Sequence, residues 1–234
     1  MQHLLLLINV MIKNRSEQEN ANIHIFDGQG DQSTPLATLD TIHRQPVKLM
    51  AYQPLNQSVV SIDERGMMEY WSAEAPYTLP RKGVDWAYKS DTAMYEFVKQ
   101  KQAPDCLTFN HRYTHFATMG IQDRIVRIWH YATGKVIRKY DESLQIASEM
   151  QQAGTSHVTL DNMEFGRRMA NENDIEKSVI KATVETPSGI HVKCLWDESD
   201  HFILYPTLIG IKGKTCIFFS SISWLKTHPV NTFL

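Results

Sequence analysis

The chain has 234 residues, enough for one large domain or for a sizeable part of a bigger protein. Its formal net charge is -2, so there is no basic excess to support nonspecific binding to nucleic-acid phosphates. The three cysteines, Cys106, Cys194 and Cys216, lie far apart and form no C-x-x-C pair. This pattern argues against a zinc ribbon or a disulfide framework and favours a reducing compartment inside the cell.

The first 22 residues predict an irregular or atypical N-terminus. Residues 4–12 are apolar, but the run is shorter than the roughly 20 residues that a membrane-spanning helix needs. No basic segment precedes it and no small-residue cleavage site follows, which argues against a signal peptide. Residues 13–22 are polar and predict a loop. We therefore expect no contact with a membrane.

Two segments further along the chain repeat one pattern of three short apolar strands separated by turns. They span residues 47–71 and 105–129, and each has an aspartate in its second turn and a tryptophan closing its third strand. This pattern is typical of a propeller blade and predicts an all-β fold, a partial β-propeller of about three to four incomplete blades. The aspartates are Asp63 and Asp123, and the tryptophans are Trp71 and Trp129.

Incomplete copies of this pattern stand at both ends of the repeat region. Residues 23–28 alternate like a strand that enters a turn, and we interpret them as the last conserved strand of an earlier blade. Another partial copy begins at residue 191, with strands predicted near 192–196 and 202–205. Residues 197–200 between these two strands, three of them acidic, predict a solvated hairpin turn rather than a cation site.

Five residues of the blades are predicted to be structural rather than catalytic. His43 precedes the first full blade, where it could bond behind Asp63 while Trp71 closes the network. Asp63 and Asp123 are each expected to accept backbone N–H bonds and so fix a tight turn between strands. Trp129 is the counterpart of Trp71 in the second full blade.

Two insertions with helical character interrupt the blades, near residues 91–102 and 144–177. Insertions on a propeller rim can engage partners, and they can equally serve as filler that covers an edge strand. Four charged residues of the second insertion form a candidate partner surface, in which Arg167 and Arg168 could contact an acidic partner or RNA phosphate. The competing interpretation pairs these arginines with glutamates of the same helix. The four residues are Glu164, Arg167, Arg168 and Glu172.

No pattern in the sequence predicts a catalytic site, a metal site or a cofactor. His111 and His115 have the i, i+4 spacing of zinc-binding helices, but they lack the glutamate of that motif and lie in a predicted strand and turn. The glycines at 28 and 30 lack the third glycine of a dinucleotide loop. Residues 213–215 resemble the end of a phosphate loop, but Leu208 stands where its first glycine is required.

Several segments in and between the blades resemble one known family, the peptidylprolyl isomerase domain and WD repeat-containing proteins. The resemblance covers about residues 23–212 and implies a WD-repeat propeller followed by a cyclophilin domain that isomerises X–Pro bonds. It also implies a nuclear protein whose partners are proteins of the splicing machinery. The segments that carry it are residues 66–71, 84–92, 95–97, 134–144, 163–170, 201–205 and 208–212.

The chain departs from this family in ways that bear on activity. No segment matches the cyclophilin domain, the first blades are missing, and the match stops after Lys212, leaving residues 213–234 as a divergent tail. We therefore expect a truncated product with domains at 1–22, 23–212 and 213–234, inactive as an isomerase by itself. The expected function is a noncatalytic WD-repeat scaffold linked to splicing. The alternative is a generic WD-repeat adaptor with no link to splicing.

Overall fold

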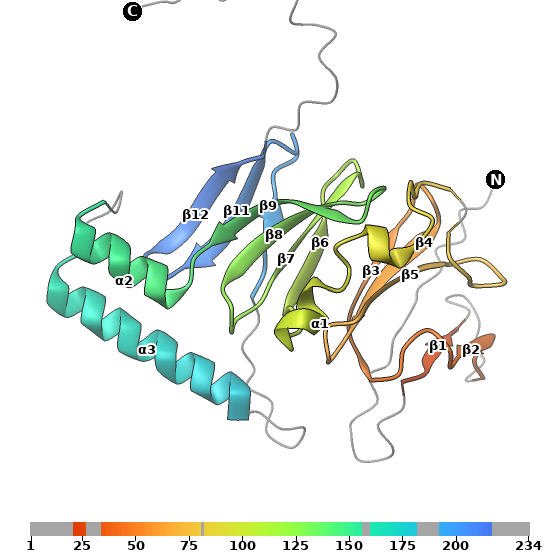
Figure 1. Ribbon diagram of the computed structural model, residues 1–234, viewed down its shortest axis with the longest axis horizontal. Coiled ribbons are helices and arrows are strands. Elements are labelled where there is room, and N and C mark those ends of the chain that lie inside the picture. Colours follow the sequence, from red (N-terminus) through yellow and green to blue (C-terminus); the bar gives the residue numbers. More distant parts are fainter. Residues whose placement is uncertain (1–20, 27–33, 81, 156–159, 182–191, 217–234) are drawn as a thin grey trace, which may run out of the picture.

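The computed structural model of the chain describes residues 21–26, 34–80, 82–155, 160–181 and 192–216. Most of the predicted N-terminal region and most of the predicted tail, as well as residues 28 and 30, lie outside these ranges. In the described part, the strands form four antiparallel sheets. Figure 1 shows these sheets standing side by side in chain order, like successive blades.

Each sheet is built from strands that follow one another in sequence. The first sheet contains β1 (Ile23–Ile25) and β2 (Ala37–Leu39), and the second contains β3 (Val47–Gln53), β4 (Ser58–Asp63) and β5 (Met68–Ser72). The third contains β6 (Cys106–Phe109), β7 (His115–Met119), β8 (Ile125–His130) and β9 (Lys135–Asp141). The fourth contains β10 (Leu195–Trp196), β11 (Phe202–Thr207) and β12 (Gly210–Thr215), so it extends past residue 212.

The core lies between the sheets, because strand side chains alternate between the two faces. In β4, Val59 packs with the first sheet, whereas Val60 and Ile62 pack toward the third sheet. The third and fourth sheets share another buried cluster, which includes Ile128 and Ile203. Each pair of neighbouring sheets therefore has its own apolar core. This stack confirms the predicted all-β fold, an open partial propeller whose described blades have two to four strands each.

The turn between β4 and β5 depends on two of its residues, Asp63 and Gly66. The Asp63 Oδ1 atom accepts the backbone N–H groups of Arg65 at 3.0 Å and Met67 at 2.8 Å. Gly66 has a φ of +84°, and a Cβ atom there would lie 2.4 Å from the carbonyl oxygen of Gln102. A side chain at this position would therefore be strained and would clash with the insertion that packs against the turn.

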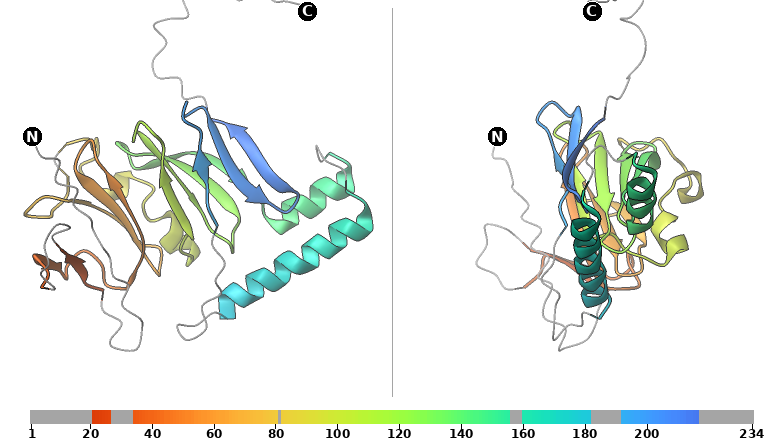
Figure 2. Two further views of the ribbon diagram at one scale, coloured as in Figure 1. Left: turned by 180° about the vertical axis from the view of Figure 1, so that it is seen from behind. Right: turned by 90° about the vertical axis from the view of Figure 1, so that its left-hand side faces the viewer.

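Helices occupy the two insertions. The first holds the 3-10 turn η1 (Lys89–Asp91) and the short helix α1 (Glu96–Gln100), which covers less than the predicted 91–102. The second holds α2 (Leu144–Ala153) and α3 (Asn162–Lys181), and α3 ends beyond residue 177. Figure 2 shows α2 and α3 at the end of the row of blades, next to the fourth sheet. Among the described residues, no helix is long and apolar enough to cross a bilayer.

Candidate structural and partner-binding sites

A buried network joins His43 to the second sheet. The His43 Nε2 atom lies 2.6 Å from the Ser61 hydroxyl, and the Trp71 indole N–H donates to the same hydroxyl at 3.1 Å. On the other side of the ring, His43 Nδ1 lies 3.5 Å from Asp63 Oδ2. The network thus runs from the turn to the closing tryptophan, with Ser61 as its central member.

The contacts of this network tie the turn, the middle of β4 and the closing tryptophan together. Burial by itself raises the pKa of Asp63, but the His43 ring and the backbone N–H groups of Met67 and Arg65 outweigh burial and hold that pKa below its usual value. Sequence reasoning did not identify Ser61. Its signal is a hydroxyl in the middle of β4, a strand that is buried on both faces and also holds Ser58.

The third sheet has no equivalent network that joins its aspartate to its tryptophan. The Trp129 indole N–H donates to the Thr118 hydroxyl at 2.9 Å. Asp123 Oδ2 instead accepts a bond from the Arg127 guanidinium at 2.6 Å, and its Oδ1 atom accepts the backbone N–H of Ile125 at 3.3 Å. Asp123 and Trp129 therefore belong to two separate clusters.

Arg127 is wholly buried and holds the first insertion onto the third sheet. It donates to the Gln100 side chain at 2.7 Å, and its guanidinium carbon lies 5.0 Å from the ring centre of Phe97. Both partners belong to α1. Sequence reasoning missed this role, since an arginine in β8 could equally have faced solvent.

Asp200 corrects one sequence-based expectation. The acidic turn at 197–200 was expected to be solvated, but Asp200 is only 5% exposed. Its carboxylate accepts bonds from the Asn110 side chain at 3.0 Å and from the backbone N–H groups of His111 at 2.8 Å and Arg112 at 3.0 Å. The prediction was wrong for this residue because its partners come from a neighbouring sheet about 90 positions away in sequence. Asp200 thus attaches the fourth sheet to the third.

The candidate partner surface on α3 is partly used by contacts within the chain. Glu164 accepts bonds from Arg167 and Arg168, each at 2.8 Å. Hydrogen bonds from Arg167 and then from Arg168 lower the pKa of the exposed Glu164 carboxyl to about 2. Glu172 pairs instead with Arg124 of the third sheet, at 2.7 Å.

Two polar contacts, one from Arg168 and one from Glu172, anchor α3 to the blades. Arg168 donates to the Ile209 carbonyl at 2.9 Å, in the turn between β11 and β12. The pair between Glu172 and Arg124 holds the helix to the turn before β8. Of the two arginines, Arg167 is the more available to a partner, because its side chain is 64% exposed and that of Arg168 only 33%.

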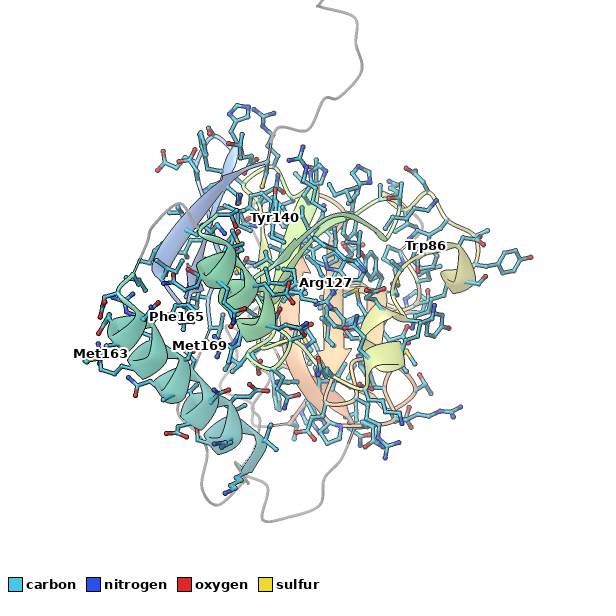
Figure 3. The ribbon with its side chains drawn as sticks, turned by 60° about the vertical axis from the view of Figure 1, so that its left-hand side comes forward. Trp86, Arg127, Tyr140, Met163, Phe165 and Met169 are labelled. Carbon is cyan, nitrogen blue, oxygen red and sulfur yellow. The ribbon has the colours of Figure 1, made fainter. Side chains whose placement is uncertain are left out.

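A groove of about 450 Å³ lies between the two helices and β12. Figure 3 shows Met163, Phe165 and Met169 along α3, with α2 beside them. Phe165 lines the groove, whereas Met163 is 84% exposed. The groove is lined by Glu142, Ile146, Ala147, Met150, Gln151, Phe165 and residues 207–214.

The histidines considered as ligands do not assemble a metal site. His115 begins β7, and its ring packs edge-on against His130 with the centroids 5.0 Å apart. Burial, followed by the charge of His130, lowers the pKa of His115 to about 4. Across the described ranges, no group of three or more His, Cys, Asp or Glu residues could hold a metal ion. The three cysteines are buried free thiols in the core shared by the third and fourth sheets.

Comparisons with known proteins relate the chain to peptidylprolyl isomerase domain and WD repeat-containing proteins. No family model matches it. The chain is 47% identical over 197 residues to "Peptidyl-prolyl cis-trans isomerase cyp15" of Rhizopus delemar, covering 84% of this chain and 30% of that protein. It is 41% identical over 198 residues to the human "Peptidylprolyl isomerase domain and WD repeat-containing protein 1", covering 84% of this chain and 28% of that protein.

Solved structures similar to the chain include WD40 domains. The C-terminal WD40 domain of Sif2 aligns with a TM-score of 0.38 and 12% identity, over 72% of this chain and 31% of that chain. The β-propeller domain of Swd1 from Myceliophteria thermophila aligns with a TM-score of 0.47 and 7% identity, over 85% and 48%. The fold assignment above rests on the sheets themselves. By sequence, the chain belongs to the family of peptidylprolyl isomerase domain and WD repeat-containing proteins, and it spans less than a third of the length of the curated relatives it matches.

Proposed function

We propose that this WD-repeat chain binds proteins of the splicing machinery in the nucleus and does not itself isomerise X–Pro bonds. The name of the human relative carries both an isomerase domain and WD repeats, and this chain corresponds to 28% of that protein. In the described blades, the polar side chains that could do chemistry are engaged in holding sheets and turns together, as His43 and Asp200 illustrate. Binding is therefore the function that this part of the family supports best.

The observation that carries the proposal is helix α3. It is 20 residues long and buries none of its side chains, so it adds little to the apolar core. Most helical stability in proteins comes from burying an amphipathic face, and this helix is held instead by polar contacts from Arg168 and Glu172. A helix fixed in this way presents a defined surface, centred on the exposed Arg167 and Met163.

Affinity purification from nuclear extract tests the proposal. The tagged full-length chain is compared with Arg167→Glu, which reverses a charge on the exposed face of α3. Lys177→Glu is the matched control, because it makes the same charge change at another exposed position of α3. We expect splicing proteins to be enriched by the wild-type chain and the control, and to be lost with Arg167→Glu. Circular dichroism of all three proteins checks that the helix is kept.

Other results would lead to different conclusions. Reproducible partners from outside splicing would favour the generic WD-repeat adaptor, and equal recovery with Arg167→Glu would remove α3 from the binding surface. Isomerase activity is measured separately on a proline-containing peptide. We expect the uncatalysed rate, with isomerisation taking tens to hundreds of seconds at 25 °C, roughly as for free peptides. Acceleration that scales with the concentration of the chain would refute the noncatalytic assignment.

A further inference from the structure

Two of the three buried thiols meet at the contact between the third and fourth sheets. Cys106 is the first residue of β6, and Cys194 directly precedes β10. The backbone N–H of Cys194 donates to the Cys106 sulfur at 3.2 Å, and the Cys194 thiol is a second hydrogen-bond partner of that sulfur. The two residues are 88 positions apart, so no spacing in the sequence identifies them as a pair.

Contacts of the neighbouring residues hold this pair in place. The Thr108 hydroxyl donates to the Cys194 carbonyl at 3.2 Å, and the Trp196 indole N–H donates to the Thr108 carbonyl at 3.1 Å. The segment that leads into β10 therefore lies along β6. The Cys194 Cα atom is one N–Cα bond beyond the bonded nitrogen, so the Cys106 sulfur lies within about 4.7 Å of it.

This geometry suits a disulfide. Two cysteines can be bridged without movement of the backbone when their Cα atoms lie within about 7 Å and their side chains point toward each other. The Cys106 and Cys194 side chains are hydrogen-bond partners, so they already face one another. A bond between the two sulfurs then requires rotation of the side chains and no separation of the sheets.

The pair is chemically asymmetric. The hydrogen bond from Cys194 lowers the pKa of Cys106 to about 7, and it outweighs burial and the Asp105 carboxylate, which both raise that pKa. The same hydrogen bond, together with burial, raises the pKa of Cys194 above its usual value. The thiolate is the reactive form of a cysteine, so Cys106 is the nucleophile and Cys194 keeps its proton. Cys106 is 4% exposed and Cys194 is wholly buried, so a small oxidant reaches Cys106 first.

We propose that Cys106 and Cys194 are a redox-sensitive pair, which hydrogen peroxide converts into a disulfide between the third and fourth sheets. The Cys106 thiolate attacks one peroxide oxygen: an S–O bond forms, the O–O bond breaks, and the leaving hydroxide takes up a proton from solvent to give water. The Cys194 sulfur then attacks the sulfenic sulfur of Cys106. The S–S bond forms, the S–O bond breaks, and the hydroxyl leaves with the Cys194 proton as a second water. Overall, two thiols lose two electrons and two protons, and one peroxide is reduced to two waters.

The disulfide adds a covalent link between two sheets that are otherwise held by noncovalent contacts. A cross-link between residues 88 positions apart closes a long loop and restricts the unfolded chain accordingly. In a reducing compartment such a bond is transient, because exchange with cellular thiols reverses it. Oxidation therefore fixes the fourth sheet to the third reversibly. The inference does not depend on the binding partners proposed above.

Oxidation of the folded full chain with hydrogen peroxide, followed by peptide mass mapping without reductant, tests the pairing. We expect the chain to lose two hydrogens and to yield a cross-linked peptide pair that contains Cys106 and Cys194. Cys106→Ser and Cys194→Ser should each abolish this product. Cys216→Ser is the matched control, because it removes another buried thiol of the same core, and it should leave the cross-link unchanged. Circular dichroism confirms that each variant is folded.

Two further measurements test the roles of the thiols and the effect of the bond. Dimedone labels sulfenic acids, and labelling of Cys106 should rise in Cys194→Ser, where no second thiol resolves the intermediate. In Cys106→Ser, Cys194 should stay unlabelled. Oxidised wild-type chain and oxidised Cys216→Ser should unfold at a higher urea concentration than their reduced forms, and dithiothreitol should reverse the shift.

Several results would overturn the proposal. A folded chain that forms no bond between Cys106 and Cys194, or forms it only in urea, would refute the pair. Cross-links that involve Cys216 to the same extent would indicate unspecific pairing of thiols. Labelling of Cys194 in Cys106→Ser would refute Cys106 as the nucleophile. An unchanged urea midpoint after complete cross-linking would show that the bond does not fix the fourth sheet.

Discussion

Replacing Ser61 by alanine should destabilise the fold far more than the loss of one small hydroxyl suggests. The Ser61 hydroxyl is fully buried and bonds both His43 and the indole of Trp71. Alanine fits the same space, so the change removes hydrogen bonds without creating a large cavity. It leaves two buried polar groups unpaired, each of which costs about 1–3 kcal/mol, for a loss of about 2–6 kcal/mol in the free energy of unfolding.

Urea denaturation followed by tryptophan fluorescence measures this loss at fixed protein concentration. Thr118→Val is a matched comparison in the third sheet, because the Thr118 hydroxyl accepts the Trp129 indole N–H and leaves a single buried donor unpaired when removed. We expect it to cost about 1–2 kcal/mol, less than Ser61→Ala. Ser90→Ala, at an exposed hydroxyl, should change stability by less than about 0.5 kcal/mol.

Ser61 and Trp71 should also be energetically coupled. In a double-mutant cycle, Ser61→Ala and Trp71→Phe should show an interaction free energy of about 0.5–3 kcal/mol, because each substitution removes the same hydrogen bond. If Ser61→Ala costs no more than Ser90→Ala, or if the cycle shows no coupling, the network does not stabilise the blade and the reasoning is refuted.

Three further predictions concern the third and fourth sheets. The pKa of His115 falls to about 4 on folding, so between pH 7 and pH 4 the unfolded chain takes up a proton at this residue before the folded chain does. The free energy of unfolding should therefore drop by about 3 kcal/mol from pH 7 to pH 4. His115→Gln should reduce this drop when the free energy of unfolding is measured by urea denaturation at each pH. Asp200→Ala should cost about 2–4 kcal/mol by the same urea assay, whereas Asp200→Asn, which keeps an acceptor oxygen, should cost less. Arg127→Met should cost about 3 kcal/mol and speed proteolysis of the first insertion, because it leaves Asp123 without its partner.

Each of these predictions has a result that would contradict it. A pH profile unchanged by His115→Gln would assign the acid sensitivity to other groups. Equal stability of Asp200→Ala and the wild-type chain would mean that the turn of the fourth sheet is held by its own strands. Wild-type resistance to proteolysis in Arg127→Met would show that α1 is attached by its other contacts, which include the packing of Phe97 and the pair between Glu96 and Lys139.

The strands could be predicted from sequence because their signal is local. Short, largely apolar runs bounded by turn residues predict buried strands, and the structure buries every residue of 58–63 and 115–119. The turn aspartates and the tryptophans marked the third strand of each unit, but the third sheet continues with β9 beyond Trp129. The extent of α1 was harder to predict, because this helix is only five residues long and the packing of Phe97 against the blades determines it more than intrinsic propensity does.

The contacts between sheets could not be predicted, because they join residues far apart in sequence. Nothing near Asp200 in the sequence identifies the backbone of His111 and Arg112 as its partners. An acidic turn that is buried and an acidic turn that is solvated have the same local sequence pattern, and only the presence of a neighbouring sheet distinguishes them. Glu172 is a similar case, since a helical pairing was considered and its partner proved to be Arg124 of the third sheet.

Helix α3 contacts both the third and the fourth sheet, so both sheets determine the position of its exposed surface. Arg124 holds the helix to the third sheet, and the Ile209 carbonyl holds it to the fourth. Between these sheets lie an apolar core and the Asp200 contact, so their relative position is already restricted. A partner that binds the exposed face of α3 therefore meets a surface whose position is set by both sheets, and it would favour the arrangement in which both anchors are made.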